Sequence, residues 1–99
     1  MVRAHLNLRA VPGRRDELLR ALDTVELGVA ARSSDLIEVE VFVPIDNPDR
    51  VLVVSSWPSA EHFERWRTGP ESGRLEAALE GLLAGKPETH VYRLVDALD

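Results

Sequence analysis

Apolar and polar residues alternate along the first ten positions of the chain. The even positions are apolar and the odd positions from 3 onward are polar: Val2, Ala4, Leu6, Leu8 and Ala10 against Arg3, His5, Asn7 and Arg9. A period of two residues predicts a β-strand with one apolar face. Pro12-Gly13 ends this strand.

The next stretch changes to a helical period. Its apolar residues recur three or four positions apart, at Leu18, Leu19, Leu22, Val25 and Val29. This spacing predicts an amphipathic helix that runs to about residue 31. Ser33, Ser34 and Asp35 then form a polar turn.

Two further strands follow, joined by a turn. Ile37, Val39, Val41 and Val43 alternate with Glu38, Glu40 and Phe42 up to Pro44, and "VLVVSSW" (51–57) is apolar on both parities, as expected of an inner strand. The intervening "DNPDR" (46–50) has turn chemistry. The pattern predicts a β-hairpin.

The last third of the chain predicts two helices and a strand. Ser59 is the expected N-cap of a short helix over 60–67, which Thr68-Gly69-Pro70 interrupts. Pro70 suits the first turn of a further helix, with a stripe of Leu75, Ala78, Leu79, Leu82 and Leu83 and a stop at Gly85 and Pro87. "THVYRLV" (89–95) reads as the final strand.

The element order is β-α-β-β-α-β, with the second helix split. This order predicts an α+β, ferredoxin-like fold with a four-stranded antiparallel sheet, forming a single domain over 1–99. Both helices should cover the face that carries Ala4, Leu6 and Leu8. The opposite face, with polar side chains beside Phe42, should meet a second sheet that encloses a partly polar cavity.

Composition narrows the possible functions. The chain has 99 residues and a net charge of −5, and its arginines are scattered, so nucleic acid is not an expected partner. Cysteine is absent, which excludes thiolate chemistry, and no apolar run has membrane-spanning length. The N-terminus lacks the apolar core of a signal peptide, so we expect a cytoplasmic protein. Lys86 is the only lysine, which limits Schiff-base chemistry to that residue.

Three segments together resemble the antibiotic biosynthesis monooxygenase family. They are "LNLRAVPGRRDELLRAL", "VLVVSSWPSAEHFERW" and "LEGLLAGKPETHVYRLV", and the likeness covers essentially the whole chain. The resemblance implies a homodimeric α/β barrel, with two sheets face to face and a pocket in each subunit between sheet and helices. It also implies oxygenases that use neither flavin, metal nor haem, in which a deprotonated phenol or anthrone passes an electron to O2.

The resemblance also assigns candidate catalytic residues. Trp66 matches the helix Trp of anthrone oxygenases and of haem-degrading relatives, His62 stands where the anthrone enzymes carry Asn, and Asn7 is close to a strand Asn. His62 would be the proton acceptor, Trp66 the pocket wall and donor to the anion, and Asn7 a second polar anchor. The haem-ligand position falls near 74–76, where there is no His, so haem degradation is disfavoured.

Each of these residues also has a structural interpretation. His62 and Trp66 share one helix stripe, but His62 fits a solvated position and Trp66 fits the core or a pocket wall without chemistry. We interpret Trp57 as scaffold, a plug between strand and helix. Phe63 is expected in the core or lining the pocket.

The polar face of the first strand offers further contacts. His5, Asn7 and Arg9 are expected to bond to one another, to Glu38 or Glu40, to a partner protomer or to substrate. Of the three, Asn7 is the one most expected to contact substrate. Phe42, Phe63 and Tyr92 are the remaining candidates for substrate contact, although Tyr92 also fits a core position with its hydroxyl at the rim. The three histidines follow no metal-ligand spacing, so a metal site is not expected. The sequence has neither a dinucleotide fingerprint nor a phosphate loop, and the resemblance implies that no other cofactor is needed.

Three functions remain open from the sequence. The first is a cofactor-independent monooxygenase that oxidises an aromatic polyketide-type or quinol substrate with O2. The second keeps the pocket without oxygen, as an isomerase, cyclase or other proton-transfer catalyst. The third is a non-catalytic, dimeric ligand-binding or accessory protein.

Overall fold

The computed structural model describes residues 1–32 and 35–96, with the backbone alone described for 24–32. In chain order the elements are β1 (Val2–Arg9), α1 (Arg15–Arg32), β2 (Glu38–Phe42), β3 (Arg50–Trp57), α2 (Ala60–Arg67), α3 (Pro70–Leu79) and β4 (Glu88–Arg93). The predicted α+β, ferredoxin-like fold is confirmed, including the split second helix. Of the residues used for the predictions, Val25 and Val29 lie outside the described side chains, and Ser33 and Ser34 lie outside the described residues.

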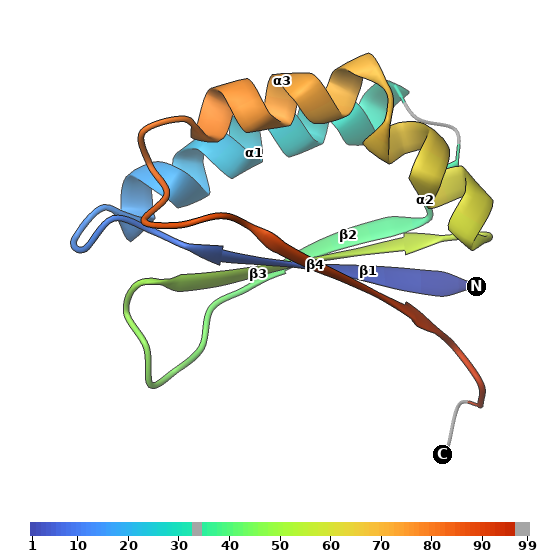
Figure 1. Cartoon of the computed structure of the whole chain (residues 1–99), viewed down its shortest axis with the longest axis horizontal. Coiled ribbons are helices and arrows are strands. Elements are labelled where there is room, and N and C mark those ends of the chain that lie inside the picture. The colour runs from blue at the N-terminus through green and yellow to red at the C-terminus, as the bar shows by residue number, and fades with distance from the viewer. Residues whose placement is uncertain (33–34, 97–99) are drawn as a thin grey trace.

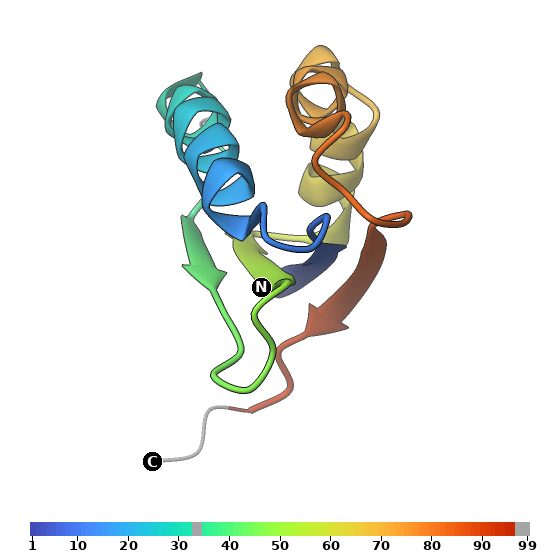
Figure 2. The same cartoon turned by 90° about the vertical axis from the view of Figure 1, so that its left-hand side faces the viewer.

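The strands form one antiparallel sheet in the order β2-β3-β1-β4. The register sets His5 of β1 opposite Val54 of β3 and opposite His90 of β4. The helices all lie over one face of this sheet, with α1 and α3 side by side (Figures 1 and 2). We call the other face, which no helix of the described chain covers, the helix-free face.

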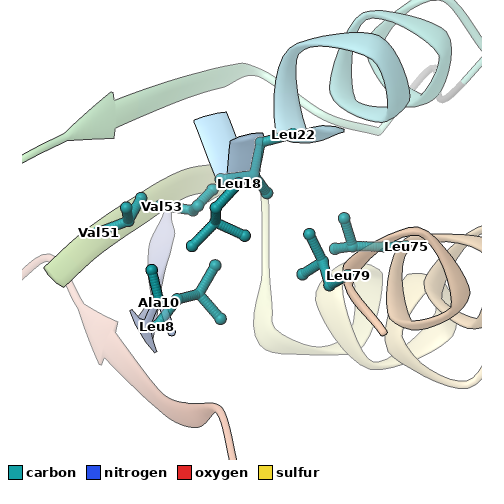
Figure 3. Close-up of a cluster of buried hydrophobic side chains, with 8 residues drawn as sticks. All are labelled: Leu8, Ala10, Leu18, Leu22, Val51, Val53, Leu75 and Leu79. Carbon is teal, nitrogen blue, oxygen red and sulfur yellow. The ribbon is translucent and has the colours of Figure 1, made fainter. Parts of the chain in front are cut away.

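The even positions of β1 face the helices, as their apolar character predicts. Ala4 and Leu8 are only 3% and 0% exposed. Leu8 belongs to a cluster in which Leu18 and Leu22 of α1 and Leu75 and Leu79 of α3 converge on β1 and β3 (Figure 3). Burial of these branched side chains is the main term that holds the helices on the sheet.

Helix α2 begins and ends where the sequence predicts. Ser59 has an extended backbone, and its hydroxyl accepts a hydrogen bond from the backbone N–H of His62, which satisfies one of the free donors of the first turn. At the other end, the Thr68 N–H donates to the Glu64 carbonyl before Pro70 opens α3. The break between α2 and α3 sets the two helices at an angle (Figure 1).

Helix α3 is shorter than the apolar stripe predicts. It ends at Leu79, so Leu82 and Leu83 lie beyond the helix, and Gly81 takes a positive φ of 81°. Leu83 instead forms an isolated β-bridge with Ala10, and the Leu82 carbonyl accepts from the Val11 N–H. The predicted stop at Gly85 and Pro87 is therefore wrong, because the chain leaves the helix early to pair with the end of β1.

Candidate functional site

A cavity of about 700 Å³ lies between the helix-covered face of the sheet and the helices α2 and α3. Its sheet side includes Ala4 and Leu6 of β1 and Val53, Ser55 and Trp57 of β3. Its helix side includes Phe63 and Trp66 of α2 and Leu75 and Leu79 of α3. This volume and apolar lining are typical of a site for a small organic molecule.

Three aromatic rings form one wall of the cavity. The ring of Trp57 is 5.8 Å from that of Phe63 and 5.9 Å from that of Trp66, and Phe63 and Trp66 stack at 6.1 Å. Phe63 and Trp66 are three residues apart on α2, so both side chains lie on the same side of that helix. Trp57 and Phe63 are 2% and 4% exposed, which fixes the rings in place.

The two indole N–H groups on this wall have different surroundings. Trp57 Nε1 donates to the hydroxyl of Ser55 at 2.9 Å. Trp66 Nε1 is buried and has no hydrogen-bond partner among the described residues. A buried donor without a partner is costly, so this N–H is the unsatisfied polar atom of the aromatic wall.

Charged side chains also border the cavity. Arg67 is one of them, and its guanidinium forms an ion pair with Glu64 at 2.8 Å. The hydrogen bonds that Arg67 donates to Glu64, together with the negative charge of that carboxylate, raise the pKa of Arg67 above the ordinary arginine value. Glu76 and Glu80 of the α3 region are further lining residues, and both are exposed to solvent.

His62 is not among the residues that line the cavity. Its Nδ1 lies 2.7 Å from the Ser59 hydroxyl, and its Nε2 is 3.9 Å from Asp35 Oδ1. The imidazole therefore lies at the N-terminal end of α2, beside the cap. Although His62 and Trp66 lie one helical turn apart on α2, the structure does not bring them together in the cavity.

The other residues predicted for the site lie on the helix-free face. The strand register sets Asn7, His5 and Phe42 there, each with its side chain on the opposite side of the sheet from Ala4 and Leu6. Tyr92 is on the same face, 53% exposed, and contacts the ring of His5 at 4.7 Å. The sequence favoured a core position for Tyr92, but in the single chain its side chain is exposed.

Arg9 ends β1 and contacts the segment after α3. Its guanidinium donates to the Ala84 carbonyl at 3.4 Å, and Arg9 does not line the cavity. Of the residues predicted for the site, only Trp66 and Phe63 are therefore part of the cavity wall.

Sequence reasoning missed two polar features of this wall. Ser55 was not singled out, and Trp57 was interpreted as scaffold alone. A signal was available, because Ser55 and Trp57 are two residues apart on one strand and must face the same side. The hydrogen bond between them depends on side-chain rotamers, which the sequence pattern does not specify.

Metal-binding and membrane-spanning features are absent from the described part of the chain. No group of three or more His, Asp or Glu side chains in residues 1–23 and 35–96 is arranged to hold a metal ion. In the same residues, no helix combines the length and the apolar character needed to cross a bilayer.

The fold and the cavity define a ferredoxin-like α+β domain with a ligand-sized apolar pocket between its sheet and helices. The chain belongs to the antibiotic biosynthesis monooxygenase family, whose sequence profile matches residues 1–78. No match was found among curated protein sequences.

Solved structures support the same fold. A proposed antibiotic biosynthesis monooxygenase from Deinococcus radiodurans superposes with a TM-score of 0.84 at 17% identity, over 100% of this chain and 97% of that one. A proposed monooxygenase of the same kind from Bordetella bronchiseptica gives 0.85 at 16% identity, over 95% and 96%. A protein of unknown function from Nitrosomonas europaea gives 0.82 at 20% identity, over 98% and 91%. At identities this low the likeness shows the fold alone.

Proposed function

We propose that this chain acts in the cytoplasm as a cofactor-independent monooxygenase that oxidises an aromatic, polyketide-type or quinol substrate with O2. The observation that carries the proposal is the aromatic wall of the cavity, with the buried N–H of Trp66 that has no partner among the described residues. A planar substrate would pack against the rings of Trp57, Phe63 and Trp66. Its phenolate or enolate oxygen would accept from the indole N–H, which stabilises the anion.

The proposed reaction needs no electron donor other than the substrate. The substrate anion passes one electron to O2, and the resulting radical and superoxide combine to form a carbon–oxygen bond. Loss of water from the peroxide then leaves a carbonyl group. For an anthrone the net change is CH2 plus O2 to C=O plus H2O, in which one oxygen atom enters the product and the other leaves as water. The enzyme contributes a dry cavity, a donor to the anion and a proton acceptor.

Three side chains are candidates for the proton acceptor. The sequence-based candidate is His62, whose Nδ1 is hydrogen-bonded to Ser59 and whose Nε2 faces Asp35 rather than the cavity. It would have to leave the Ser59 hydroxyl before it could reach a substrate. Glu76 and Glu80 already border the cavity, so the geometry favours one of these carboxylates.

The proposed active form is a homodimer, as the family resemblance implies. The helix-free face supports it, because exposed Phe42 and Tyr92 stand there among side chains of both charges, including Arg3, Glu38 and Glu40. A self-complementary face of this kind suits a two-fold contact between identical chains. In that arrangement His5, Asn7 and Phe42 would contact the partner protomer.

Oxygen consumption tests the proposed function directly. The protein is incubated with dithranol, a hydroxylated anthrone, in an oxygen electrode, and the rate is compared with spontaneous oxidation at the same pH. We expect a catalysed rate that falls at least tenfold in Trp66→Phe, which keeps a ring and removes the N–H. An uptake equal to the spontaneous rate for dithranol and for a hydroquinone alike would exclude the oxygenase.

A second candidate function is ligand binding without catalysis. It is favoured by one observation, that no histidine is among the described residues of the cavity wall. Tight binding of an aromatic ligand with no conversion, in air or under argon, would select this function. Conversion that proceeds equally well under argon would instead select a proton-transfer enzyme, such as an isomerase or cyclase.

A further inference from the structure

Ser55 is a cavity residue whose hydrogen bonding is only half used. It lies on β3, on the side of the sheet that carries Ala4 and Val39, and all three residues line the cavity. Its hydroxyl oxygen accepts the indole N–H of Trp57 at 2.9 Å. The Trp57 side chain is 2% exposed and is packed against Phe63, so this bond is held in a fixed geometry.

The remaining group of Ser55 is its own hydrogen. A serine hydroxyl has one donor and two acceptor sites, and the Trp57 N–H occupies one acceptor site. Among the described atoms, which include the side chains of residues 1–23 and 35–96, the Ser55 hydroxyl makes no other hydrogen bond. A hydroxyl that already accepts a bond is also polarised into a better donor. Ser55 therefore presents an oriented O–H donor in the wall of an apolar cavity, and among the described residues this donor has no acceptor.

A second unspent donor belongs to the same wall. The Trp66 N–H is buried without a partner in the part of the chain that the structure describes. The Trp66 ring lies 5.9 Å from the ring of Trp57, which is hydrogen-bonded to Ser55. Arg67, the arginine among the described residues that line the cavity, is already paired with Glu64. The polar recognition offered by this wall thus includes two neutral donors, the Ser55 O–H and the Trp66 N–H.

We propose that Ser55 and Trp66 together hold one acceptor oxygen of a planar, apolar ligand, and that Trp57 is the positioning residue for Ser55. The inference rests on the same cavity as the proposed function and names what that cavity selects. The preferred ligands carry a ketone or phenolate oxygen. Ligands without oxygen gain only ring packing. Carboxylate and phosphate ligands would find no unpaired cation among the described residues of this wall and would be repelled by Glu76 and Glu80 at the cavity border.

A matched pair of probes isolates the oxygen. Fluorenone and fluorene have the same tricyclic shape and differ by C=O against CH2. Both tryptophans of the chain line the cavity, so quenching of their fluorescence reports binding. We expect the protein to bind fluorenone more tightly than fluorene. Ser55→Ala should weaken fluorenone binding roughly threefold to tenfold and leave fluorene binding within about twofold.

Trp57→Phe tests the positioning role. It keeps a ring against Phe63 but removes the N–H that orients Ser55, so it should lower the preference for fluorenone, and it should cause no further loss when added to Ser55→Ala. Ser55→Thr keeps an O–H and should retain the preference. Ser56→Ala is the control, since Ser56 is the next residue of β3 and faces the other side of the sheet.

Three results would overturn the inference. They are equal losses for fluorenone and fluorene in Ser55→Ala, an additive effect of Trp57→Phe in the Ser55→Ala background, and the absence of binding by either probe. These titrations measure binding in air or under argon and do not depend on turnover. If the protein prefers fluorenone but does not consume O2 with dithranol, the proposed role of Ser55 and Trp66 in ligand binding stands and the proposed oxygenase activity is excluded.

Discussion

Trp57 and Trp66 line one cavity and differ in what their indole N–H groups meet. Trp57 donates to Ser55, whereas Trp66 has no partner among the described residues. The sequence separated the two residues by position, since one ends a strand and the other lies on a short helix. It could not predict this difference in bonding, because a hydrogen bond between side chains depends on rotamers and on distances set by the whole fold.

His62 shows the same limit from the other direction. Its spacing from Trp66 predicts one shared helix face, and the backbone does place both on α2. The cap residue Ser59, three positions before His62, holds the imidazole by a 2.7 Å contact at the helix N-terminus. A local polar partner therefore sets the direction of this side chain. Helical periodicity alone does not predict such a contact.

Ser59→Ala should destabilise the protein through the cap. The substitution removes the acceptor of the His62 backbone N–H and the partner of its ring, so we expect a loss of about 1 kcal/mol in the free energy of unfolding. Urea denaturation measures it. The control is His62→Ala, which removes the ring and keeps the cap, and should cost less. Equal losses in the two variants would mean that the ring contact, and not the cap, carries the stabilisation.

The proton acceptor is the other question at the scale of single residues. If Glu76 or Glu80 accepts the proton, the double variant Glu76→Gln/Glu80→Gln should lower kcat with dithranol at least tenfold, while fluorenone binding changes by less than about twofold. His62→Gln should then keep most of the activity. The rates are compared across pH under oxygen saturation. A reversed result, with activity lost only in His62→Gln, would mean that the imidazole turns into the cavity during the reaction.

At the scale of elements, alternation and helical spacing predict every strand and helix of the described chain. The exception is the end of α3, where Leu82 and Leu83 continue the stripe but lie beyond the helix. These residues instead pair with the end of β1, through the bridge of Leu83 with Ala10. A pairing between positions so far apart in sequence outweighs local helix propensity, and no local pattern indicates it.

Substitution by alanine should have opposite effects on stability at two glycines of this region. Gly73 lies inside α3 and Gly81 follows it with a φ of 81°, and an added methyl group would meet nothing within 4 Å at either position. Gly73→Ala should therefore stabilise the protein by about 0.5–1 kcal/mol, because alanine is the better helix former.

Gly81→Ala should instead destabilise the protein by about 1–2 kcal/mol, because an L-residue is strained at positive φ. Since space is open at both sites, a difference in sign isolates the backbone conformation. Thermal and urea unfolding of the two variants measure it. A stabilising effect of Gly81→Ala would show that the segment after α3 can take another conformation at little cost.

At the scale of the whole molecule, the sheet divides the predicted site residues into two groups. The sequence assigned the polar positions of β1 to the face away from the helices, and the register agrees. It also joined Asn7 to Trp66 in one site, but Asn7 points to the helix-free face, whereas Trp66 lines the cavity on the other face. Alternation predicts the face of a strand residue, but not which face carries the cavity.

The helix-free face leads to the last prediction, which concerns assembly. Phe42 and Tyr92 are 47% and 53% exposed there, a large apolar area for a face that also carries charges of both signs. If two chains associate through this face, Phe42→Asp places a carboxylate in an apolar contact and should shift the protein from dimer to monomer, with an apparent dissociation constant raised at least tenfold.

Sedimentation velocity over a range of concentrations measures this shift. Arg74→Asp, at an exposed site on α3, is the matched control and should leave the dimer unchanged. Because the cavity lies on the other side of the sheet, a monomeric Phe42→Asp protein should still prefer fluorenone to fluorene. If Arg74→Asp dissociates the dimer and Phe42→Asp does not, the dimer interface lies on the helices. The exposed rings of the helix-free face would then have a role other than dimerisation.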